Sequence, residues 1–378
     1  LAVQASNGTN SKDTDRKAIQ DEIDQLNTEI DRVAETTKFN EIYLLKGDDG
    51  EKTINLNAHD AGLKGTLVDN GSGKATFTMK ELSVGDSVSI GGKNYTIGST
   101  AADAQKIVTG QEKAGGKVTV NGVEYTYNDT DKKWKDAAGA DVQIGTGAAA
   151  GKIVIGDGDK VSDGTTTLTA MTDKKDATGA AKADGVDDND NSVISAEKAY
   201  SLAKDELVAA NHIGDTENTA AVAQDTTNKN VFTITTGSAK VANTLSFSLH
   251  VGADADMTNK ITVDIDTMNS ANLGIKGLNV TDKNGTAATY AIDAISDAIS
   301  KVSSQRSALG AVQNRLEHTI DNLDNISENT SSAESRIRDT DMAKEMVNYS
   351  KNNILAQAGQ SMLAQANQSN QGVLSLLQ

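Results

Sequence analysis

The stretch KAIQDEIDQLNTEIDRVAET, residues 17–36, decides the fold at the N-terminal end of this chain. Its apolar side chains recur alternately four and three residues apart, at Ile19, Ile23, Leu26, Ile30 and Val33. That spacing is the a/d seam of a coiled coil, and it fits a strand poorly. Most of the intervening residues are charged, so the opposite face of the helix is expected to be exposed to solvent. We therefore predict an amphipathic helix that ends near Thr36 and needs a partner for its apolar side.

A second seam of the same period lies toward the other end of the chain. It begins near Tyr290, is expected to loosen over the polar stretch Ser327–Ser335, and then resumes. Its first part comprises Ile292, Ile295, Ile299, Val302, Leu309, Val312, Leu316, Ile320, Leu323 and Ile326. Its second part comprises Ile337, Met342, Met346, Ile354, Leu355, Met362, Leu363, Leu374 and Leu377. Two seams at opposite ends of a chain bury each other only if the ends run side by side.

The residues between the seams have a different texture, rich in Gly, Thr, Asp, Asn and Lys with short alternating segments. Val88–Ile97 and Val118–Tyr127 each indicate a hairpin, because Gly-Gly and Asn-Gly supply the positive φ of a two-residue turn. We also predict a helix over Ser195–Ala210 and a hairpin from Leu245–Val251 and Ile261–Ile265.

These patterns predict an α+β protein, a long α-helical coiled-coil rod made from both chain ends with an inserted β-rich variable region. The expected divisions are residues 1–46 for the N-terminal part of the rod and 47–241 for the β-rich region, in two subdomains. Residues 242–336 should form a β-hairpin and the C-terminal rod helix, and 337–378 a C-terminal amphipathic helix. An apolar seam that has no cover is an association surface.

Composition excludes several classes of protein. A net charge of -17 over 378 residues leaves no basic face for nucleic acid. The sequence has no apolar run of about 18 residues, the length that would indicate a membrane span. The chain has no Cys, hence no disulfide or thiolate metal site, and only 3% aromatic residues, which favours an elongated shape over a thick globular core.

The chain also has no Pro. Long helices exclude proline, which is one explanation. The other is that a protein exported unfolded gains from the absence of slow prolyl isomerisation. The two explanations carry equal weight at this point.

Several long motifs resemble bacterial flagellin. At the N-terminal end they are Leu1–Asn10, Ile19–Ile23, Glu29–Val33 and Thr37–Asn40, and at the C-terminal end Ser304–Leu316, Glu334–Ala343 and Gln365–Gln378. Together these motifs span roughly the first 45 and the last 135 residues. The middle resembles no family that we would name. A hook–filament junction protein has similar terminal rods, but the Gln365-Ala366-Asn367 ending favours flagellin.

The resemblance implies a structural subunit, not an enzyme, that is exported unfolded and polymerises outside the cell into the flagellar filament for motility. It implies no cofactor, and as partners other copies of the chain, an export chaperone and a cap protein. Residues 337–378 would form the innermost layer and stay disordered until subunits pack around them. The family has a further helical arm ahead of Leu-Ala-Val-Gln, so we expect the true N-terminus to lie before Leu1.

The resemblance also implies a patch that Toll-like receptor 5 recognises, at positions Leu1, Gln4 and Glu22. The alternative is that these are ordinary rod residues that serve packing between subunits. Because the patch would be buried in the filament, only the monomer should signal.

Other functions find less in the sequence. His59, His212, His250 and His318 are scattered without metallopeptidase spacing, and no nucleophile motif occurs. Asp187–Asn191 raises the possibility of calcium, but its spacing excludes an EF-hand, so a solvated loop is the better interpretation, as it is for Asp254 and Asp256. A surface adhesin or glycan-binding module in the middle region remains the alternative function, and composition cannot decide whether its Ser and Thr residues carry sugars.

Overall fold

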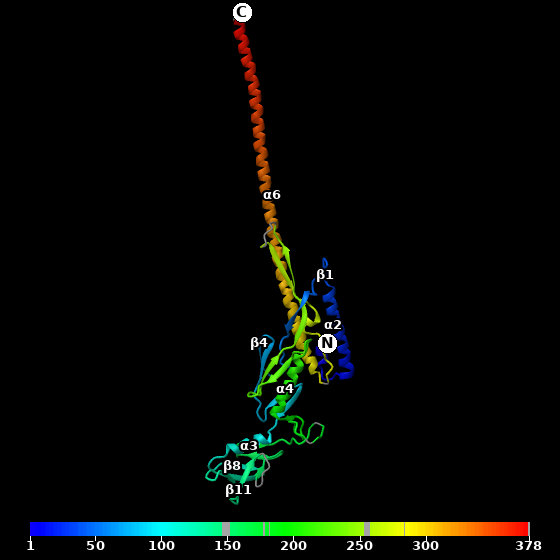
Figure 1. Ribbon diagram of the computed structural model, residues 1–378, viewed down its shortest axis with the longest axis vertical. Helices are drawn as coiled ribbons and strands as arrows, with labels where there is room; N and C mark the ends of the chain where they lie inside the picture. The colour runs from blue at the N-terminus through cyan, green and yellow to red at the C-terminus, as the bar shows by residue number, and fades with distance from the viewer. Residues whose placement is uncertain (146–151, 177, 181, 253–257, 283, 377–378) are drawn as a thin grey trace. The chain divides into compact units, whose positions relative to one another are not determined.

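The computed structural model describes residues 1–145, 152–176, 178–180, 182–252, 258–282 and 284–376. The chain forms two compact units. The first comprises Leu1–Ser246 with Asp264–Gln305, and the second comprises Phe247–Val263 with Arg306–Gln378. Figure 1 labels the main elements of both.

The N-terminal end is helical, as predicted. A short helix α1 (Ala2–Ala5) is followed by a π-helical turn, Lys12–Arg16, and then by α2 (Lys17–Thr36). The Ser11 hydroxyl caps the π turn by accepting a hydrogen bond from the Asp15 N–H. After α2 a two-stranded hairpin forms from β1 (Lys38–Phe39) and β2 (Ile42–Tyr43).

The middle of the chain is β-rich and is organised as several small sheets. A four-stranded sheet has the order β16-β17-β5-β4, a three-stranded sheet β15-β7-β6, and a two-stranded sheet β18-β3. Their strands are β3 (Asp48–Asn55), β4 (Gly65–Gly71), β5 (Lys74–Met79), β6 (Ser87–Ile90), β7 (Lys93–Ile97), β15 (Val193–Ile194), β16 (Ala221–Gln224), β17 (Val231–Thr235) and β18 (Ser238–Asn243).

Helix α4 (Ala196–Asn211) provides one side of the core beneath these sheets. Its inner face, which includes Tyr200 and Leu207, packs in one cluster with Phe77 of β5 and Phe232 of β17. Both phenylalanine rings are fully buried. The cluster is therefore a conventional hydrophobic core that holds the middle of the chain together.

A seven-stranded sheet forms a separate core with α3 (Ala101–Gly110). Its order is β12-β11-β10-β9-β8-β13-β14. The strands are β8 (Lys117–Val120), β9 (Val123–Asn128), β10 (Lys133–Lys135), β11 (Asp141–Gly145), β12 (Lys152–Val154), β13 (Lys160–Ser162) and β14 (Thr167–Thr169). Trp134 is buried in this core. Its ring meets the Tyr127 ring edge-on, with the two ring centres 5.2 Å apart.

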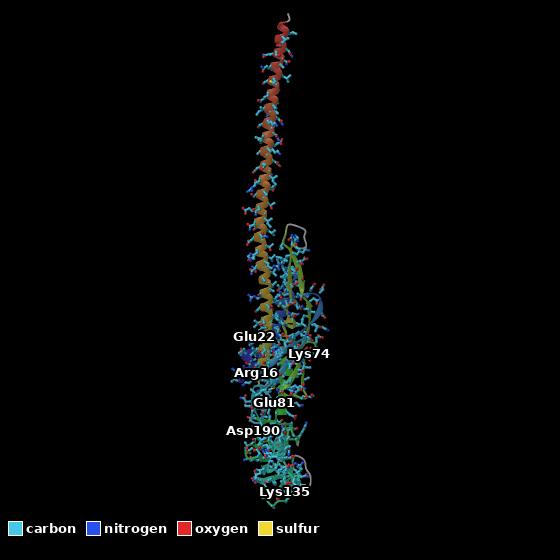
Figure 2. All side chains as sticks on the ribbon, turned by 90° about the vertical axis from the view of Figure 1, so that its left-hand side faces the viewer. Arg16, Glu22, Lys74, Glu81, Lys135 and Asp190 are labelled. Atoms are coloured by element: carbon cyan, nitrogen blue, oxygen red, sulfur yellow. The ribbon has the colours of Figure 1, made fainter. Side chains whose placement is uncertain are left out.

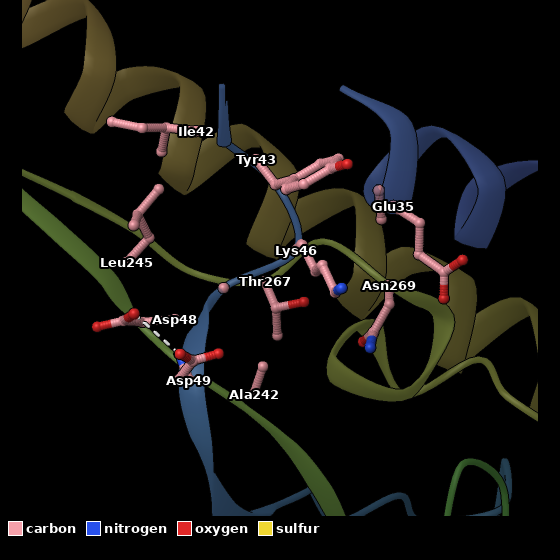
Figure 3. A pocket seen from close by; sticks show the side chains of 12 residues that line it. Glu35, Ile42, Tyr43, Lys46, Asp48, Asp49, Ala242, Leu245, Thr267 and Asn269 are labelled. Carbon is pink, nitrogen blue, oxygen red and sulfur yellow. Dashed lines mark hydrogen bonds between the residues drawn. The ribbon is translucent and has the colours of Figure 1, made fainter. Parts of the chain in front are cut away.

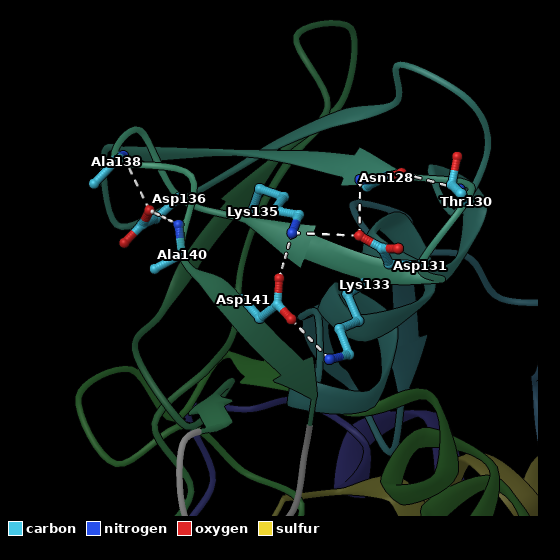
Figure 4. A network of polar contacts seen from close by, with 9 residues as sticks. All are labelled: Asn128, Thr130, Asp131, Lys133, Lys135, Asp136, Ala138, Ala140 and Asp141. Carbon is cyan, nitrogen blue, oxygen red and sulfur yellow. Dashed lines mark hydrogen bonds and ion pairs between the residues drawn. The ribbon is translucent and has the colours of Figure 1, made fainter.

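The solvent face of this sheet carries a ladder of ion pairs (Figure 4). Asp141 accepts hydrogen bonds from Lys133 at 2.7 Å and from Lys135, and Lys135 also lies 3.4 Å from Asp131. The hydrogen bonds from Lys133 and Lys135 lower the pKa of Asp141 to about 2. Most of the ladder is exposed to solvent and Lys135 is half-buried, so its ion pairs contribute little to the free energy of unfolding.

The predicted hairpins and the predicted middle helix are confirmed. β6 pairs with β7 across Gly91 and Gly92, and β8 pairs with β9 across Asn121 and Gly122. All four turn residues have positive φ, as a primed two-residue turn requires. The middle helix starts one residue later than predicted and ends one residue later, at Asn211.

The C-terminal part begins with the predicted hairpin, β19 (Leu245–His250) and β20 (Lys260–Ile265), followed by the short helix α5 (Ser270–Leu273). Helix α6 then runs without a break from Thr286 to Leu376 (Figure 1). The expected loosening over Ser327–Ser335 was wrong, because no residue there is a helix breaker such as proline or glycine and the polar side chains stay solvated.

The start of α6 is attached to the core of the middle region. Tyr290 is buried in the cluster of Phe77 and Phe232, and its hydroxyl donates a hydrogen bond to Glu206 of α4. Burial and the neighbouring Glu206 carboxylate both raise the pKa of Tyr290 far above its usual value. The tyrosine therefore stays neutral and acts as a fixed anchor for the helix.

Candidate functional site

The inner face of α2 packs in a cluster of its own. Ile19 and Ile23 are buried there with Ala288, Ala291 and Ala298 of α6. Helix α5 adds Leu273, and the segment between α5 and α6 adds Ile275, Leu278 and Val280 to the same cluster. Helix α2 and the start of α6 thus share one apolar core, to which residues far apart in the sequence contribute.

Polar side chains beside the apolar seam of α2 attach the helix to α5 and to the segment between α5 and α6. The Gln20 amide donates to the Leu278 carbonyl at 2.8 Å, and its oxygen accepts from the Val280 N–H at 2.8 Å. Asn27 donates to the Ile275 carbonyl at 3.2 Å, and Asp31 accepts from the main chain and hydroxyl of Ser270. The sequence analysis missed these residues, although their helical spacing could have shown that they share a face.

The predicted rod-packing residues differ in burial. Ile19 and Ile23 are buried and Ile30 is half-buried, whereas Leu26 is 50% exposed and Val33 41% exposed. On α6, Ile299 and Val302 are 61% and 37% exposed. Leu309, Leu316 and Leu323 are half-buried. Among the described residues, the cluster around α2 is shorter than the long paired seam that the sequence suggested.

A groove of about 350 Å³ lies at the N-terminal end of α2. It contains two of the predicted receptor-patch residues, Gln4 and Glu22, while the third, Leu1, is 39% exposed beside it. The lining residues are Gln4, Asn10, Asp15, Ala18, Ile19 and Glu22. Glu22 is exposed, and Figure 2 shows where it lies along the chain. Four of the six lining residues are therefore polar, and two of these, Asp15 and Glu22, are acidic.

A second groove, of about 520 Å³, lies at the C-terminal end of α2 (Figure 3). Its wall includes Ile42 and Tyr43 of the β1–β2 hairpin, and the Lys46 ammonium lies 5.5 Å from the centre of the Tyr43 ring. Glu35, Asp48 and Asp49 also line it. No residue predicted from the sequence as a site lies in this groove.

The predicted assembly residues of α6 are exposed wherever the structure describes them. Ile337, Met342, Met346, Ile354, Leu355, Met362, Leu363 and Leu374 are between 58% and 71% exposed. Leu377 lies outside the described residues. Neighbouring apolar residues on the same helix, such as Val347 and Tyr349, are equally open, each at 65%. This stretch of helix therefore has apolar side chains without cover within the subunit.

Two further searches of the described residues bear on other kinds of site. No group of three or more Asp, Glu, His or Cys residues there could hold a metal ion. The carboxylates of Asp187 and Asp188 accept main-chain N–H groups of Thr172, Asn189 and Lys174 and so order their own loop. Asp254 and Asp256 lie outside the described residues. In the described part of the chain we also find no helix with the length and apolarity of a bilayer span.

Apolar side chains left open along a helix of an otherwise folded subunit indicate a protein that associates with other protein surfaces. Comparison with known proteins identifies its family. The model of the bacterial flagellin N-terminal helical region matches residues 1–49, and that of the C-terminal helical region matches residues 292–377.

Relatives extend the similarity over the whole chain. A flagellin of Clostridium tyrobutyricum is 32% identical over 375 residues, which cover 98% of this chain and 76% of that protein. Flagellin C of Vibrio cholerae serotype O1 is 32% identical over 377 residues, 100% of this chain and 75% of that protein. A Bacillus subtilis flagellin is 49% identical over 156 residues, 36% of this chain and 51% of that protein.

The chain therefore belongs to the flagellin family, whose members are structural subunits of the bacterial flagellar filament. The relatives give no support to the alternative of an adhesin or glycan-binding module in the middle region, and that interpretation is withdrawn.

Proposed function

We propose that this subunit polymerises outside the cell through its two helical ends, with residues 337–378 in the centre of the filament and the β-rich middle facing outward. The observation that carries the proposal is the uncovered apolar series from Ile337 to Leu374. Burying each such side chain contributes about 1.5–3 kcal/mol, so the eight described ones contribute on the order of 12 kcal/mol or more. A neighbouring copy is the partner that supplies this burial at every repeat.

The coiled-coil rod belongs to the same proposal. Leu26 and Val33 on α2, and Ile299 and Val302 on α6, continue the two seams but are exposed in the single subunit. We propose that they become buried when copies pack side by side. An export chaperone would cover the exposed apolar side chains of residues 337–374 before assembly. A cap protein would hold the incoming subunit at the tip. Both would shield the same apolar surface.

Excising the seven-stranded sheet tests whether assembly depends on the ends alone. The chain enters and leaves this part at adjacent points, because the Met171 N–H donates to the Ser99 carbonyl at 2.8 Å and Ser99 bridges Ala170. All buried residues of its core lie between residues 104 and 161. Replacing residues 100–169 by a short Gly-Ser linker should change the critical concentration for polymerisation by no more than about twofold, since no assembly residue is removed.

The measurement is sedimentation and electron microscopy of the subunit as the cell makes it. Circular dichroism of the excised variant provides the control for folding. A folded variant that makes no filaments would contradict the proposed outward position of this sheet.

We propose as a second function that Toll-like receptor 5 contacts the monomer at Leu1, Gln4 and Glu22. The groove lined by Gln4 and Glu22, with its mostly polar and partly acidic wall, supports this proposal. Replacing Glu22 with Lys should lower receptor activation by monomer about tenfold, the usual cost of reversing a charge in a contact. Asp21→Lys is the matched control, because Asp21 is the preceding residue of α2, is 61% exposed and does not line the groove. Equal activation by wild type and Glu22→Lys would argue against the receptor contact.

A further inference from the structure

Arg16 is the most unusual buried residue of the chain. It is 0% exposed, although arginine is almost never fully buried without partners. To carbonyls of the described residues its guanidinium donates hydrogen bonds from Nε to Ala5 at 2.8 Å, from Nη2 to Asn7 at 3.1 Å and from Nη1 to Asp282 at 3.0 Å. One side chain thus connects the N-terminal turn, the start of α2 and the segment before α6.

The local backbone explains how the side chain comes to point inward. Residues 12–16 form a π turn, in which the Arg16 N–H bonds the Ser11 carbonyl at 3.0 Å. The wider π turn places one extra residue ahead of α2 and sets Arg16 apart from the charged face of that helix. Burying a guanidinium without hydrogen bonds would cost several kcal/mol, so the three carbonyls account for its position.

Two of the carbonyls that Arg16 meets lie at the C-terminal end of α1. Ala5 ends α1, and Asn7 follows in the adjoining turn, where its carbonyl also accepts from the Asn10 N–H at 3.1 Å. Side chains bond neighbouring carbonyls as well, since the Ser6 hydroxyl donates to the Val3 carbonyl at 2.8 Å and the Asn10 amide donates to the Gln4 carbonyl at 2.6 Å. Cationic and amide donors at the end of a helix stabilise it through these carbonyls and through the helix dipole.

The third contact continues into the start of α6. Asp282 accepts hydrogen bonds from Thr286 at the first turn of that helix. Burial opposes ionisation of Asp282, but the hydrogen bonds from Thr286 outweigh it and lower its pKa. Gly285 packs closely against the same joint, because a Cβ added there would lie 2.7 Å from the Ser6 carbonyl oxygen and 2.9 Å from Nη2 of Arg16.

We infer that Arg16 is a positioning residue that builds the N-terminal groove: by holding the α1 turn, it places Gln4 opposite Glu22 of α2. This inference rests on the proposed function of the groove in receptor contact. Arg16 itself touches no partner. Its effect passes through the carbonyls of Ala5 and Asn7, so the recognition surface depends on a residue that a partner never reaches.

Arg16→Met tests the inference, with Arg32→Met as the matched control. Arg32 lies on α2, the helix that follows Arg16, but it is exposed and pairs with Glu29. Losing these charge-assisted hydrogen bonds should speed amide exchange of residues 1–10 and lower receptor activation by monomer, both about tenfold or more. Exchange in α4 should stay unchanged, as should all readouts of Arg32→Met.

Two further variants keep the test decisive if Arg16→Met folds poorly. Arg16→Lys retains the charge but not the planar fork that reaches three carbonyls, so its effect should lie between wild type and Met. Gly285→Ala keeps the Arg16 side chain but crowds both its Nη2 and the Ser6 carbonyl, so it should also speed exchange of residues 1–10.

The outcomes separate the inference from the function on which it rests. If exchange of residues 1–10 is unchanged in Arg16→Met, or if Gln4→Ala lowers receptor activation and Arg16→Met does not, the positioning role is overturned. If exchange rises but Gln4→Ala and Glu22→Lys leave receptor activation unchanged, the receptor function fails while Arg16 still positions the turn.

Discussion

Removing residues 337–378 should abolish polymerisation and leave the middle of the subunit folded as before. The apolar side chains in this stretch are more than half exposed in the subunit, so their loss uncovers no buried surface and costs the core nothing. The filament, by contrast, loses on the order of 12 kcal/mol of burial per subunit. A change of that size raises the critical concentration beyond any that can be reached. Sedimentation of filaments and circular dichroism of the soluble protein measure the two effects.

Point substitutions distinguish loss of apolar contact from loss of length. Met342→Ser with Met346→Ser removes two apolar side chains from α6, whereas Asn352→Ser with Asn353→Ser changes only polar ones. The methionine pair should raise the critical concentration about a hundredfold or more, at about 1.5 kcal/mol or more per side chain, and the asparagine pair should leave it unchanged. Equal critical concentrations for the two pairs of substitutions would mean that the exposed apolar side chains of α6 do not drive assembly.

Phe232→Ala should destabilise the middle of the subunit more than any surface change. Phe232 is fully buried, is paired across the sheet with Phe77, and has its ring centre 6.4 Å from the ring centres of both Phe77 and Tyr200. Truncating a buried phenylalanine costs the transfer free energy of the ring and leaves a cavity, together about 3–5 kcal/mol. The free energy of unfolding in urea, followed by circular dichroism, measures this loss.

The matched control applies the same substitution at an open position. Phe39 in the β1–β2 hairpin is 74% exposed, so Phe39→Ala should change the free energy of unfolding by less than about 0.5 kcal/mol. If both variants unfolded at the same urea concentration, the cluster around Phe77 and Phe232 would not be the core of this region.

Local patterns predicted the elements well. The seam spacing predicted α2 to its last residue, Thr36, and the Gly-Gly and Asn-Gly pairs predicted two hairpins at their turns. These signals are local, since amphipathic period and positive φ depend on neighbours in the sequence. The continuity of α6 across Ser327–Ser335 was missed, because a polar stretch is compatible with a solvated helix and only breakers end one.

The tertiary arrangement of the N-terminal site could not be predicted from the same patterns. Gln20 and Asn27 bond carbonyls about 250 residues away in the sequence, and no local rule identifies such a partner. The sequence pattern did not single out Arg16, whereas the π turn directs it into the interior. Burial of a charged residue depends on acceptors supplied by the fold, so it becomes visible only in three dimensions.

Hydrogen exchange of α6 before and after polymerisation tests the central claim most directly, that copies of this chain cover the apolar side chains of residues 337–374. A helix that lacks tertiary cover opens readily, so in the monomer its amides should exchange fast. In the filament the same amides should exchange about a hundredfold more slowly or slower still. Equally fast exchange of these amides in monomer and filament would contradict the account.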